Sequence, residues 1–448
     1  MNMQNTNELW LGFVPREWQY FRVKDIAQLS PSFSNGNPTP NELCTVIPME
    51  AVSEKGQLDT STIDEFNLVT SGLTNFEVGD VIFAKITPCM ENGKGAYVDK
   101  LPTRYALGST EFHVLRPRFR IVGKFLYYYT YNSVYRDYAE ANMSGAAGQK
   151  RISSKFINYT RIYLPPINEQ RCIAAYLDKT CAAIDTAIEK KQKQLETLDA
   201  LRKSIIHKAV TRGLDDSVEL RDSGVEWIGK VPKHWQLFRL KDVAEVNGRA
   251  LPATTDADFV LRYLEISNVN NRGIVSEDAI EEIAFVDAPS RARRIVLTGD
   301  TLISSVRPNL QAVAHITNGT DNFIASTGFY VVSPNHKRLD PKYTHYFLLS
   351  ENTKQYLEAV AKGVGYPAVD DKDFTTLKCF LPPIPEQRQI VDYLDRKIAV
   401  LYDVQKNLTG QIAALELYRK SLIHECVTGK RRIAEDDLRE NTSNLVLT

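Results

Sequence analysis

The sequence contains an internal repeat, in which matching segments lie 217 residues apart. Residues 10–27 return as residues 227–244 with 11 identities in 18 positions, and these two segments contain all four tryptophans. Two further blocks return at the same spacing, 164–178 as 381–395 and 202–207 as 419–424. A period this long exceeds the unit of any solenoid, so the sequence predicts two similar halves that are each large enough to fold.

The centres of the two halves diverge. They share only scattered landmarks, which are Gly79-Asp80 with Gly299-Asp300, Pro88 with Pro308, and Ser109-Thr110 with Ser326-Thr327. Two halves with similar ends and helices but different central segments would suit a function that needs the same geometry twice and a different specificity each time. The alternative is that the surface loops of an old duplication have drifted without a functional reason.

Each half ends in a predicted long helix. From Glu169 to about Arg212 the chain lacks proline and glycine, and apolar residues recur every seven positions. The first seam contains Leu177, Ile184, Leu198 and Ile205, with Cys181, Ile188 and Leu195 at its second position. The second seam contains Leu394, Leu401, Leu408, Leu415 and Leu422, with Ile398 and Ile412 between them. Gly410 weakens the second helix without ending it, and the polar seam residues Lys191 and Gln405 are expected to fix register or orientation.

Two arrangements satisfy these seams. One is a coiled coil between two copies of the chain. The other is an antiparallel pair within one chain, because its two helices are separated by a whole domain; this pair would give a pseudo-twofold rod with a globular domain at each end. Pro165-Pro166 and Pro382-Pro383 stand where proline favours the start of each helix.

The remaining segments predict a mixed α+β fold. Short apolar runs of strand length alternate with Gly, Asn, Pro and Asp, whereas 123–141 and 341–361 have helical spacing. The expected organisation is two globular domains and two helical regions followed by a polar tail, with boundaries at 1–163, 164–212, 213–380, 381–430 and 431–448.

Composition excludes several classes of protein. The 55 basic residues balance the 55 acidic residues, so a global electrostatic field does not identify a partner. The six cysteines include no CxxC pair, which argues against a zinc site and a disulfide framework and favours the reducing cytoplasm. Charges interrupt every apolar run before the ~20 residues that a membrane span needs, and the polar N-terminus does not resemble a signal peptide.

The common catalytic signatures are also missing. The sequence contains no GxxxxGK[ST], GxGxxG, HExxH or GxSxG motif. The Leu-Pro-Pro-Ile segments at 164–167 and 381–384 lack the polar first residue and the aromatic residue with which amino-methyltransferases hold a base. We therefore expect that this chain is not itself an enzyme and binds no metal.

Basic and polar clusters in both halves indicate contact with nucleic acid. Lys and Arg on phosphates would position a duplex, and Arg, Asn or Gln at base edges would read it. The candidates are Lys94, Arg116, Arg118, Gln149, Lys150, Arg151 and Lys155 in the first half, and Arg291, Arg293, Arg294, Arg307 and Tyr366 in the second half. Each cluster taken alone is equally compatible with an ordinary solvated face.

Two repeated motifs give the whole chain a family resemblance. The pattern Leu-Pro-Pro-Ile-x-Glu-Gln-Arg occurs at 164–171 and 381–388, and Trp-Ile/Leu-Gly-x-Val-Pro-x-x-Trp occurs at 10–18 and 227–235. In this order they resemble the specificity subunit of Type I restriction–modification systems. The resemblance implies two target-recognition domains that read the halves of a split, asymmetric double-stranded DNA site, with helices that set the gap between the halves.

The resemblance also implies partners and cofactors. Two modification subunits that bind S-adenosylmethionine and methylate adenine would dock on the helices, and restriction subunits would use ATP and magnesium, so this chain would bind no cofactor. Structural or docking roles are implied for Glu169, Gln170, Arg171, Glu386, Gln387 and Arg388, for which helix capping is an equal alternative. A protein-interaction scaffold derived from such a subunit remains the competing function.

Overall fold

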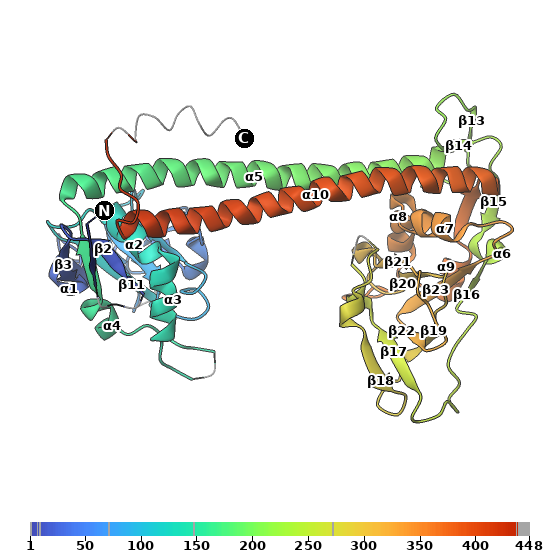
Figure 1. Ribbon diagram of the computed structural model, residues 1–448, viewed down its shortest axis with the longest axis horizontal. Helices are drawn as coiled ribbons and strands as arrows, with labels where there is room; N and C mark the ends of the chain where they lie inside the picture. The colour runs from blue at the N-terminus through green and yellow to red at the C-terminus, as the bar shows by residue number, and fades with distance from the viewer. Residues whose placement is uncertain are drawn as a thin grey trace. The chain divides into compact units, whose positions relative to one another are not determined.

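The computed structural model describes residues 2–6, 8, 10–69, 72–146, 148–270, 273–435 and 437. Most of the expected polar tail therefore lies outside the described residues. The chain forms two compact units, in which unit 1 comprises Met1–Gln192 with Gly410–Thr448 and unit 2 comprises Lys193–Thr409. Each unit combines one globular part with one stretch of each long helix (Figure 1).

Unit 1 has two four-stranded sheets, in the strand orders β6-β5-β10-β7 and β4-β11-β8-β9. Side chains such as Phe76, Ile82 and Phe112 fill the core between these sheets. The strands are β1 (Met3–Asn5), β2 (Phe13–Pro15), β3 (Gln19–Arg22), β4 (Ala27–Leu29), β5 (Leu43–Ile47), β6 (Ile63–Glu65), β7 (Thr74–Phe76), β8 (Val81–Ala84), β9 (Gly95–Tyr97), β10 (Tyr105–Gly108), β11 (Phe112–Pro117) and β12 (Arg161–Leu164). The helices are α1 (Val23–Ile26), α2 (Gly123–Tyr131), α3 (Ser133–Ala141) and α4 (Ser154–Tyr159).

Unit 2 repeats this topology strand for strand, in the orders β18-β17-β22-β19 and β16-β23-β20-β21. The one parallel pair of unit 1, β5 with β10, has its counterpart in β17 with β22. The strands are β13 (Leu220–Asp222), β14 (Lys230–Pro232), β15 (Gln236–Arg239), β16 (Ala244–Val246), β17 (Val260–Leu264), β18 (Glu281–Ala284), β19 (Ala292–Ile295), β20 (Thr301–Ser304), β21 (Val313–His315), β22 (Phe323–Ser326), β23 (Phe329–Pro334) and β24 (Lys378–Leu381). The helices are α6 (Leu240–Val243), α7 (Pro341–Leu348), α8 (Glu351–Val360) and α9 (Asp371–Thr375).

The helical segments expected at 123–141 and 341–361 each break into two helices at a polar cap. The side chain of Asn132 accepts a hydrogen bond from the backbone of α3, and Ser350 does the same for α8. Such caps satisfy amide groups that a helix start leaves free. Each break therefore follows from a short polar residue inside an otherwise helical pattern.

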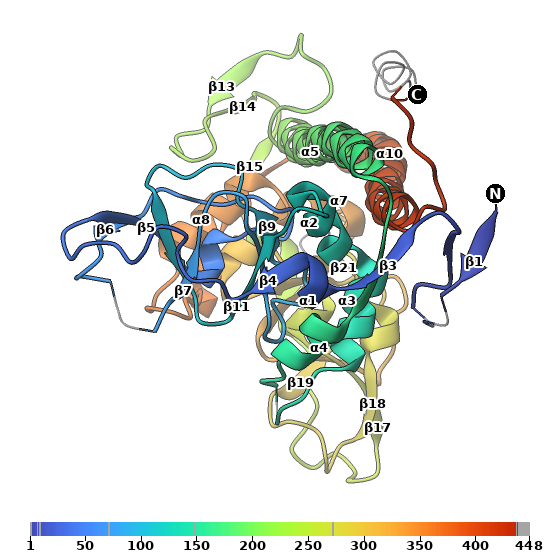
Figure 2. The ribbon, with the colours of Figure 1, turned by 90° about the vertical axis from the view of Figure 1, so that its left-hand side faces the viewer.

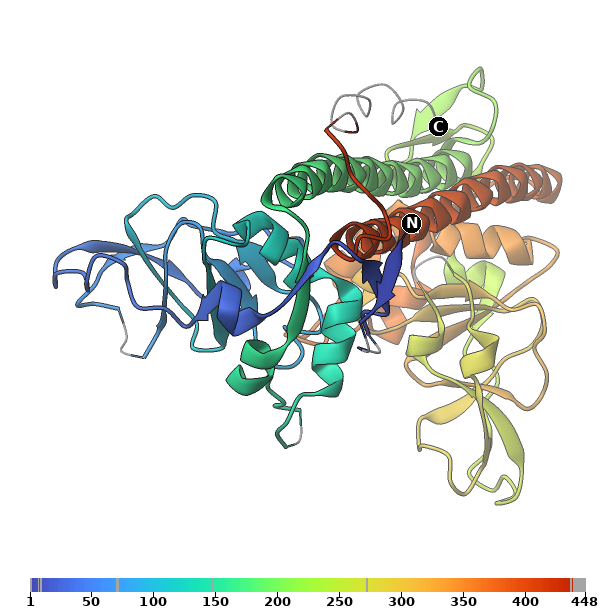
Figure 3. The ribbon, with the colours of Figure 1, turned by 60° about the vertical axis from the view of Figure 1, so that its left-hand side comes forward.

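The long helices are α5 (Ile167–Arg212) and α10 (Ile384–Val427), and α10 continues through Gly410 as expected. Within unit 1 the two helices run side by side in opposite directions (Figure 3). Asp185 on α5 pairs with Arg419 on α10, whereas Lys191, further along α5, donates to the earlier residue Gln411. The α+β class and the paired long helices expected from the sequence are thus confirmed.

A repeated aspartate joins each long helix to its globular part. Asp178 accepts hydrogen bonds from Lys124 and Tyr128 of α2, which lies against the helix pair in the near end-on view of Figure 2. In unit 2, Asp395 accepts them from Lys342 and Tyr346 of α7. Among the described residues, no helix is long and apolar enough to cross a membrane.

Candidate nucleic-acid interface

Each globular part contains a buried aspartate that pairs with an arginine. In unit 1 this arginine is Arg116, one of the candidates for DNA contact. In unit 1 the Asp80 carboxylate accepts hydrogen bonds from Nε and Nη2 of Arg116, both at 2.8 Å. Nη1 of Arg116 donates to the carbonyl of Ser32 and to the hydroxyl of Ser34. Hydrogen bonding to Asp80 raises the pKa of the Arg116 guanidinium. All of its nitrogens therefore face partners within unit 1.

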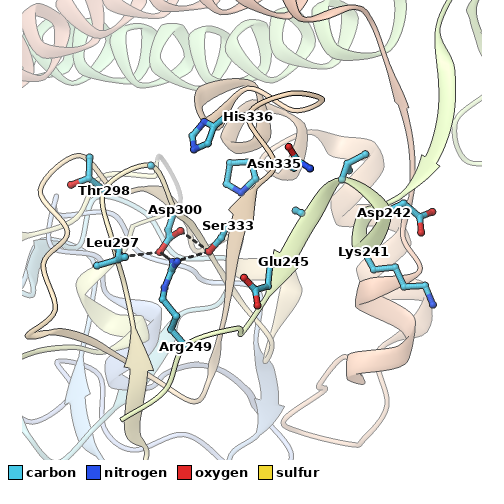
Figure 4. Close-up of a pocket in the computed structure, with 14 residues that line it drawn as sticks. Lys241, Asp242, Glu245, Arg249, Leu297, Thr298, Asp300, Ser333, Asn335 and His336 are labelled. Atoms are coloured by element: carbon cyan, nitrogen blue, oxygen red, sulfur yellow. Dashed lines mark hydrogen bonds and ion pairs between the residues drawn. The ribbon is translucent and has the colours of Figure 1, made fainter.

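Unit 2 builds the same hub with the arginine and the serine exchanged. Asp300 accepts hydrogen bonds from Nη2 of Arg249 at 2.6 Å and from the hydroxyl of Ser333 at 2.7 Å, beside a polar cavity of about 590 Å³ (Figure 4). The repeat spacing of 217 residues matches Ser333 with Arg116 and matches Arg249 with Ser32. The arginine that pairs with the aspartate therefore comes from a different aligned position in each unit.

The glutamines of the repeated Glu-Gln-Arg blocks are buried clamps. Gln170 donates to the carbonyls of Arg120 and Pro165 and accepts from the amide of Val122. Gln387 makes the same three bonds in unit 2, with Arg338, Pro382 and Asp340 as partners. Each clamp fixes the start of a long helix against the loop that precedes α2 or α7.

The glutamates of these blocks also face their own units. Glu169 pairs with Arg432 at 3.0 Å, and burial raises the pKa of its carboxyl group. Glu386 accepts hydrogen bonds from the indole of Trp235 and from the ring of His234. In contrast, Arg171 is exposed, and the exposed Arg388 lies 3.9 Å from Asp340. Of the three residue types, only the arginines project into solvent.

The seam leucines are buried most completely near the globular parts. Leu177, Ile184, Leu394 and Leu422 are buried. Leu198, Ile205, Leu401, Leu408 and Leu415 are partly buried. Gln405, the polar residue in the second seam, is itself buried.

In unit 1 three of the six basic candidates, Lys150, Arg151 and Lys155, lie on or shortly after one hairpin, of which residues 144–146 and 148–151 are described. Ser144 and Arg151 exchange two backbone hydrogen bonds at its base. The amide of Thr87, in the loop after β8, donates to the carbonyl of Lys150 at 3.1 Å. Hydrogen bonds thus tie the hairpin to the end of the β4-β11-β8-β9 sheet.

The candidates around this hairpin differ in whether their side chains already have a charged partner within the unit. The Arg151 guanidinium pairs with Glu111 at 2.8 Å, which lowers the pKa of that carboxyl group. Gln149, Lys150 and Lys155 are exposed, and neither lysine has an ion-pair partner among the described residues. Outside the hairpin, the ammonium group of Lys94 donates to the carbonyl of Met49, and the exposed Arg118 donates to the carbonyl of Lys24.

A buried histidine anchors the hairpin at its C-terminal end. Nε2 of His113 lies 3.0 Å from the carbonyl of Ile152, the residue that follows the hairpin. Burial lowers the pKa of His113 to about 4, so the ring is neutral near pH 7. A neutral ring facing a carbonyl must carry its proton on Nε2, and it therefore donates this hydrogen bond.

Unit 2 has an equivalent hairpin with different side chains. Lys362 and Ala368 exchange two backbone hydrogen bonds at its base, at 2.8 and 2.9 Å. The amide of Arg307 donates to the carbonyl of Pro367 at 2.7 Å, as Thr87 donates in unit 1. Arg307 and Tyr366, both candidates from the sequence, therefore meet at this hairpin.

The other candidates of unit 2 lie on and before β19. Arg291 pairs with Glu265 at 2.5 Å and donates to the hydroxyl of Tyr263. The guanidinium of Arg293 lies 4.8 Å from the ring centroid of Phe285. Arg294 is partly buried, and its Nε has no hydrogen-bond partner among the described residues. These three residues contribute nothing to the hairpin of Arg307 and Tyr366.

Sequence reasoning missed Thr87 and Arg249. Thr87 is uncharged, and its only signal is the shared proline that follows it, Pro88 in unit 1 and Pro308 in unit 2. Arg249 stands apart from the basic clusters, so no charge pattern marks it. Aligning the two halves at 217 residues would have matched it with Ser32 and revealed the exchange.

Comparison with known families matches both halves of the chain. A family model described as "Type I restriction modification DNA specificity domain" matches residues 15–197 and again residues 232–414. Together the two matches cover most of the chain.

Relatives of known name match to different extents. The Type I restriction enzyme EcoAI specificity subunit of Escherichia coli is 29% identical over 226 residues, covering 50% of this chain and 37% of that protein. The putative type I restriction enzyme MjaX specificity subunit of Methanocaldococcus jannaschii is 22% identical over 448 residues, covering 96% of this chain and 97% of that protein. This chain therefore spans little more than a third of the first relative and nearly all of the second.

Two solved structures share the architecture. One, described as "Structural basis underlying complex assembly and conformational transition of the type I R-M system", has a TM-score of 0.73 at 18% identity and covers 93% of this chain and 99% of its own. The other, the HsdS subunit from Thermoanaerobacter tengcongensis, has a TM-score of 0.55 at 18% identity and covers 93% and 98%. At these identities the likeness establishes the fold alone.

Proposed function

The chain belongs to the family of Type I restriction modification DNA specificity domains, of which it carries two copies. From this premise we propose that each unit reads one half of a bipartite, asymmetric DNA site. The observation that carries this proposal is the pair of equivalent hairpins. The hairpin closed by Ser144 with Arg151 and the hairpin closed by Lys362 with Ala368 each have two reciprocal backbone hydrogen bonds at the base, and they carry different side chains. Two such hairpins can offer two different sets of base-contacting side chains to DNA.

The polar contacts divide the candidates by role. Arg116 and Arg151 are held by the carboxylates of Asp80 and Glu111, so they support the fold that presents the hairpins. Lys150 and Lys155 are exposed without carboxylate partners among the described residues. We assign these two lysines to the phosphate backbone, which attracts cations without regard to sequence.

We further propose that the chain acts without catalysis of its own. Two modification subunits dock on α5 and α10, bind S-adenosylmethionine and methylate adenine. Restriction subunits use ATP and magnesium for translocation and cleavage. The exposed arginines Arg171 and Arg388 are equivalent points of contact in the two copies, as two identical partners require. The helices set the number of unread base pairs between the half-sites.

Replacing Lys150 by alanine tests the assignment to phosphates. We expect DNA affinity to fall several-fold and the slope of log K against log salt to become shallower by about 0.9, because one fewer counterion is released. The measurement is a salt titration of DNA binding by the complex of this chain with its modification subunits. Arg151 is unsuitable for this test because its loss would also leave Glu111 without its partner.

Lys100→Ala serves as the matched control, because Lys100 is an exposed lysine of unit 1 that follows β9, outside the hairpin and outside the long helices. It should leave the salt slope unchanged. An unaltered slope for Lys150→Ala would contradict the assignment. A complex that binds all DNA sequences equally would instead favour the scaffold function over sequence recognition.

A further inference from the structure

An arginine and a tyrosine form an exposed stack on the hairpin of unit 2. The guanidinium carbon of Arg307 lies 4.2 Å from the ring centroid of Tyr366. The Tyr366 side chain is 73% exposed, and the neighbouring Val364 is fully exposed. A cation over an aromatic face is attracted by the ring's electrons, and a planar guanidinium stacks well on it. The contact therefore holds the Arg307 guanidinium against the Tyr366 ring while leaving the pair open to solvent.

The backbone beneath this stack is strained and tightly held. Arg307 adopts φ 49° and ψ 59°, and Gln311, at the other end of the short turn Pro308–Leu310, adopts φ 49°. A left-handed conformation is unfavourable for a residue with a side chain, because Cβ comes too close to the following carbonyl oxygen. Arg307 is kept there by the 2.7 Å hydrogen bond from its amide to Pro367. Strain of this kind persists where the surroundings impose it, and it gathers at functional sites.

The charges nearby single out Arg307. Lys362, the other cation of the hairpin, pairs with Asp370 at 2.5 Å and lies 3.5 Å from Asp373. Arg307 has no carboxylate partner among the described residues. Arg307 is thus a cation without a described carboxylate partner, and it lies against an exposed aromatic ring. Base edges in the major groove carry hydrogen-bond acceptors that such a guanidinium can contact.

Unit 1 lacks this arrangement at the same place. Thr87 occupies the position of Arg307 and donates its amide to Lys150. In the aligned hairpins, Gln149 and Lys150 precede Arg151 where Tyr366 and Pro367 precede Ala368. The stack is therefore particular to unit 2, as expected of a group that distinguishes one half-site from the other.

We infer that Arg307, oriented by Tyr366, reads a guanine in the half-site recognised by unit 2. This inference rests on the proposed function. Two N–H groups of one guanidinium match the O6 and N7 acceptors of guanine in the major groove, and no other base offers that pair of acceptors. Holding the guanidinium against the ring in advance reduces the ordering that binding requires. Arg307 is the residue that specifies the base, and Tyr366 is a positioning residue.

The test maps the methylated DNA motif produced by this chain with its modification subunits, for wild type, Arg307→Ala, Arg307→Lys and Tyr366→Leu. With Arg307→Ala we expect one guanine of one half-site to lose preference by about tenfold or more, with the other half-site unchanged. Arg307→Lys should keep the charge and lose the same preference, because an ammonium group cannot make the paired contact. Tyr366→Leu should weaken the preference less. Tyr366 is 73% exposed, so its replacement removes no side chain from the core of unit 2.

Two results would overturn the inference while leaving the proposed function intact. One is a wild-type split motif that all three variants reproduce unchanged. The other is a uniform loss of affinity for every sequence with Arg307→Ala, together with a salt slope shallower by about 0.9, as for a phosphate contact. A wild-type complex with no sequence motif would overturn the proposed function itself. Tyr366→Phe, which retains the aromatic face, is the matched control and should preserve the motif.

Discussion

Leu394→Asp is expected to remove most of the stability of unit 2. Leu394 lies at the start of the α10 seam with none of its side chain exposed, in one core cluster with Trp235 and Tyr343. The change removes a packed side chain and buries a carboxyl group without a partner, which together cost about 4 kcal/mol or more. Native domains are stable by only about 5–15 kcal/mol. Chemical denaturation followed by circular dichroism would measure the loss.

Val400→Asp provides the matched control, because Val400 lies on the same helix and in the same unit with 61% of its side chain exposed. We expect its free energy of unfolding to stay within about 0.5 kcal/mol of wild type. Equal losses for the two variants would show that the seam does not stabilise unit 2 and would contradict the helix packing described above.

Arg116→Ser is expected to cost unit 1 about 3 kcal/mol, because it leaves the Asp80 carboxylate buried without its cation. Unit 2 indicates how to restore the pair. There the arginine stands at the position equivalent to Ser32, and a serine stands at the position equivalent to Arg116. The double variant Ser32→Arg with Arg116→Ser therefore transplants the unit 2 hub into unit 1 and should recover a substantial part of the loss.

A double-mutant cycle measures this exchange directly. We expect Ser32→Arg alone to be neutral or destabilising, because Arg116 already pairs with both carboxylates of the site, Asp80 at 2.8 Å and Glu77 at 3.0 Å. The coupling free energy between the two positions should favour the double variant by about 1 kcal/mol or more. A double variant whose loss equals the sum of the two single losses would mean that the hubs are not interchangeable.

The architecture was largely predictable because its signals are periodic. The seven-residue spacing predicted α5 and α10 through Gly410, and short apolar runs of strand length predicted the mixed α+β fold. The 217-residue repeat predicted two similar halves, and the strand orders of the two units agree. Packing of apolar faces decides these features, so a pattern of residue types is sufficient to find them.

Electrostatic partners were not predictable in this way. A run of arginines in the sequence does not reveal that Arg116 faces Asp80 or that Arg151 faces Glu111. These partners lie far apart along the chain, and strand pairing brings them together. The same holds for Arg307 and Tyr366, which the sequence proposed separately. They meet where backbone hydrogen bonds from Arg307 to Pro367 and from Val369 to Ser305 join their segments.

We propose that this chain selects the DNA sequence at which its partners methylate adenine. Single-molecule sequencing of adenine methylation tests it directly, in cells that carry the modification subunits with and without the gene for this chain. We expect one split motif to be methylated throughout the genome only when the chain is present, which would give both half-sites and the gap between them. Identical methylation maps in the two strains would contradict the account.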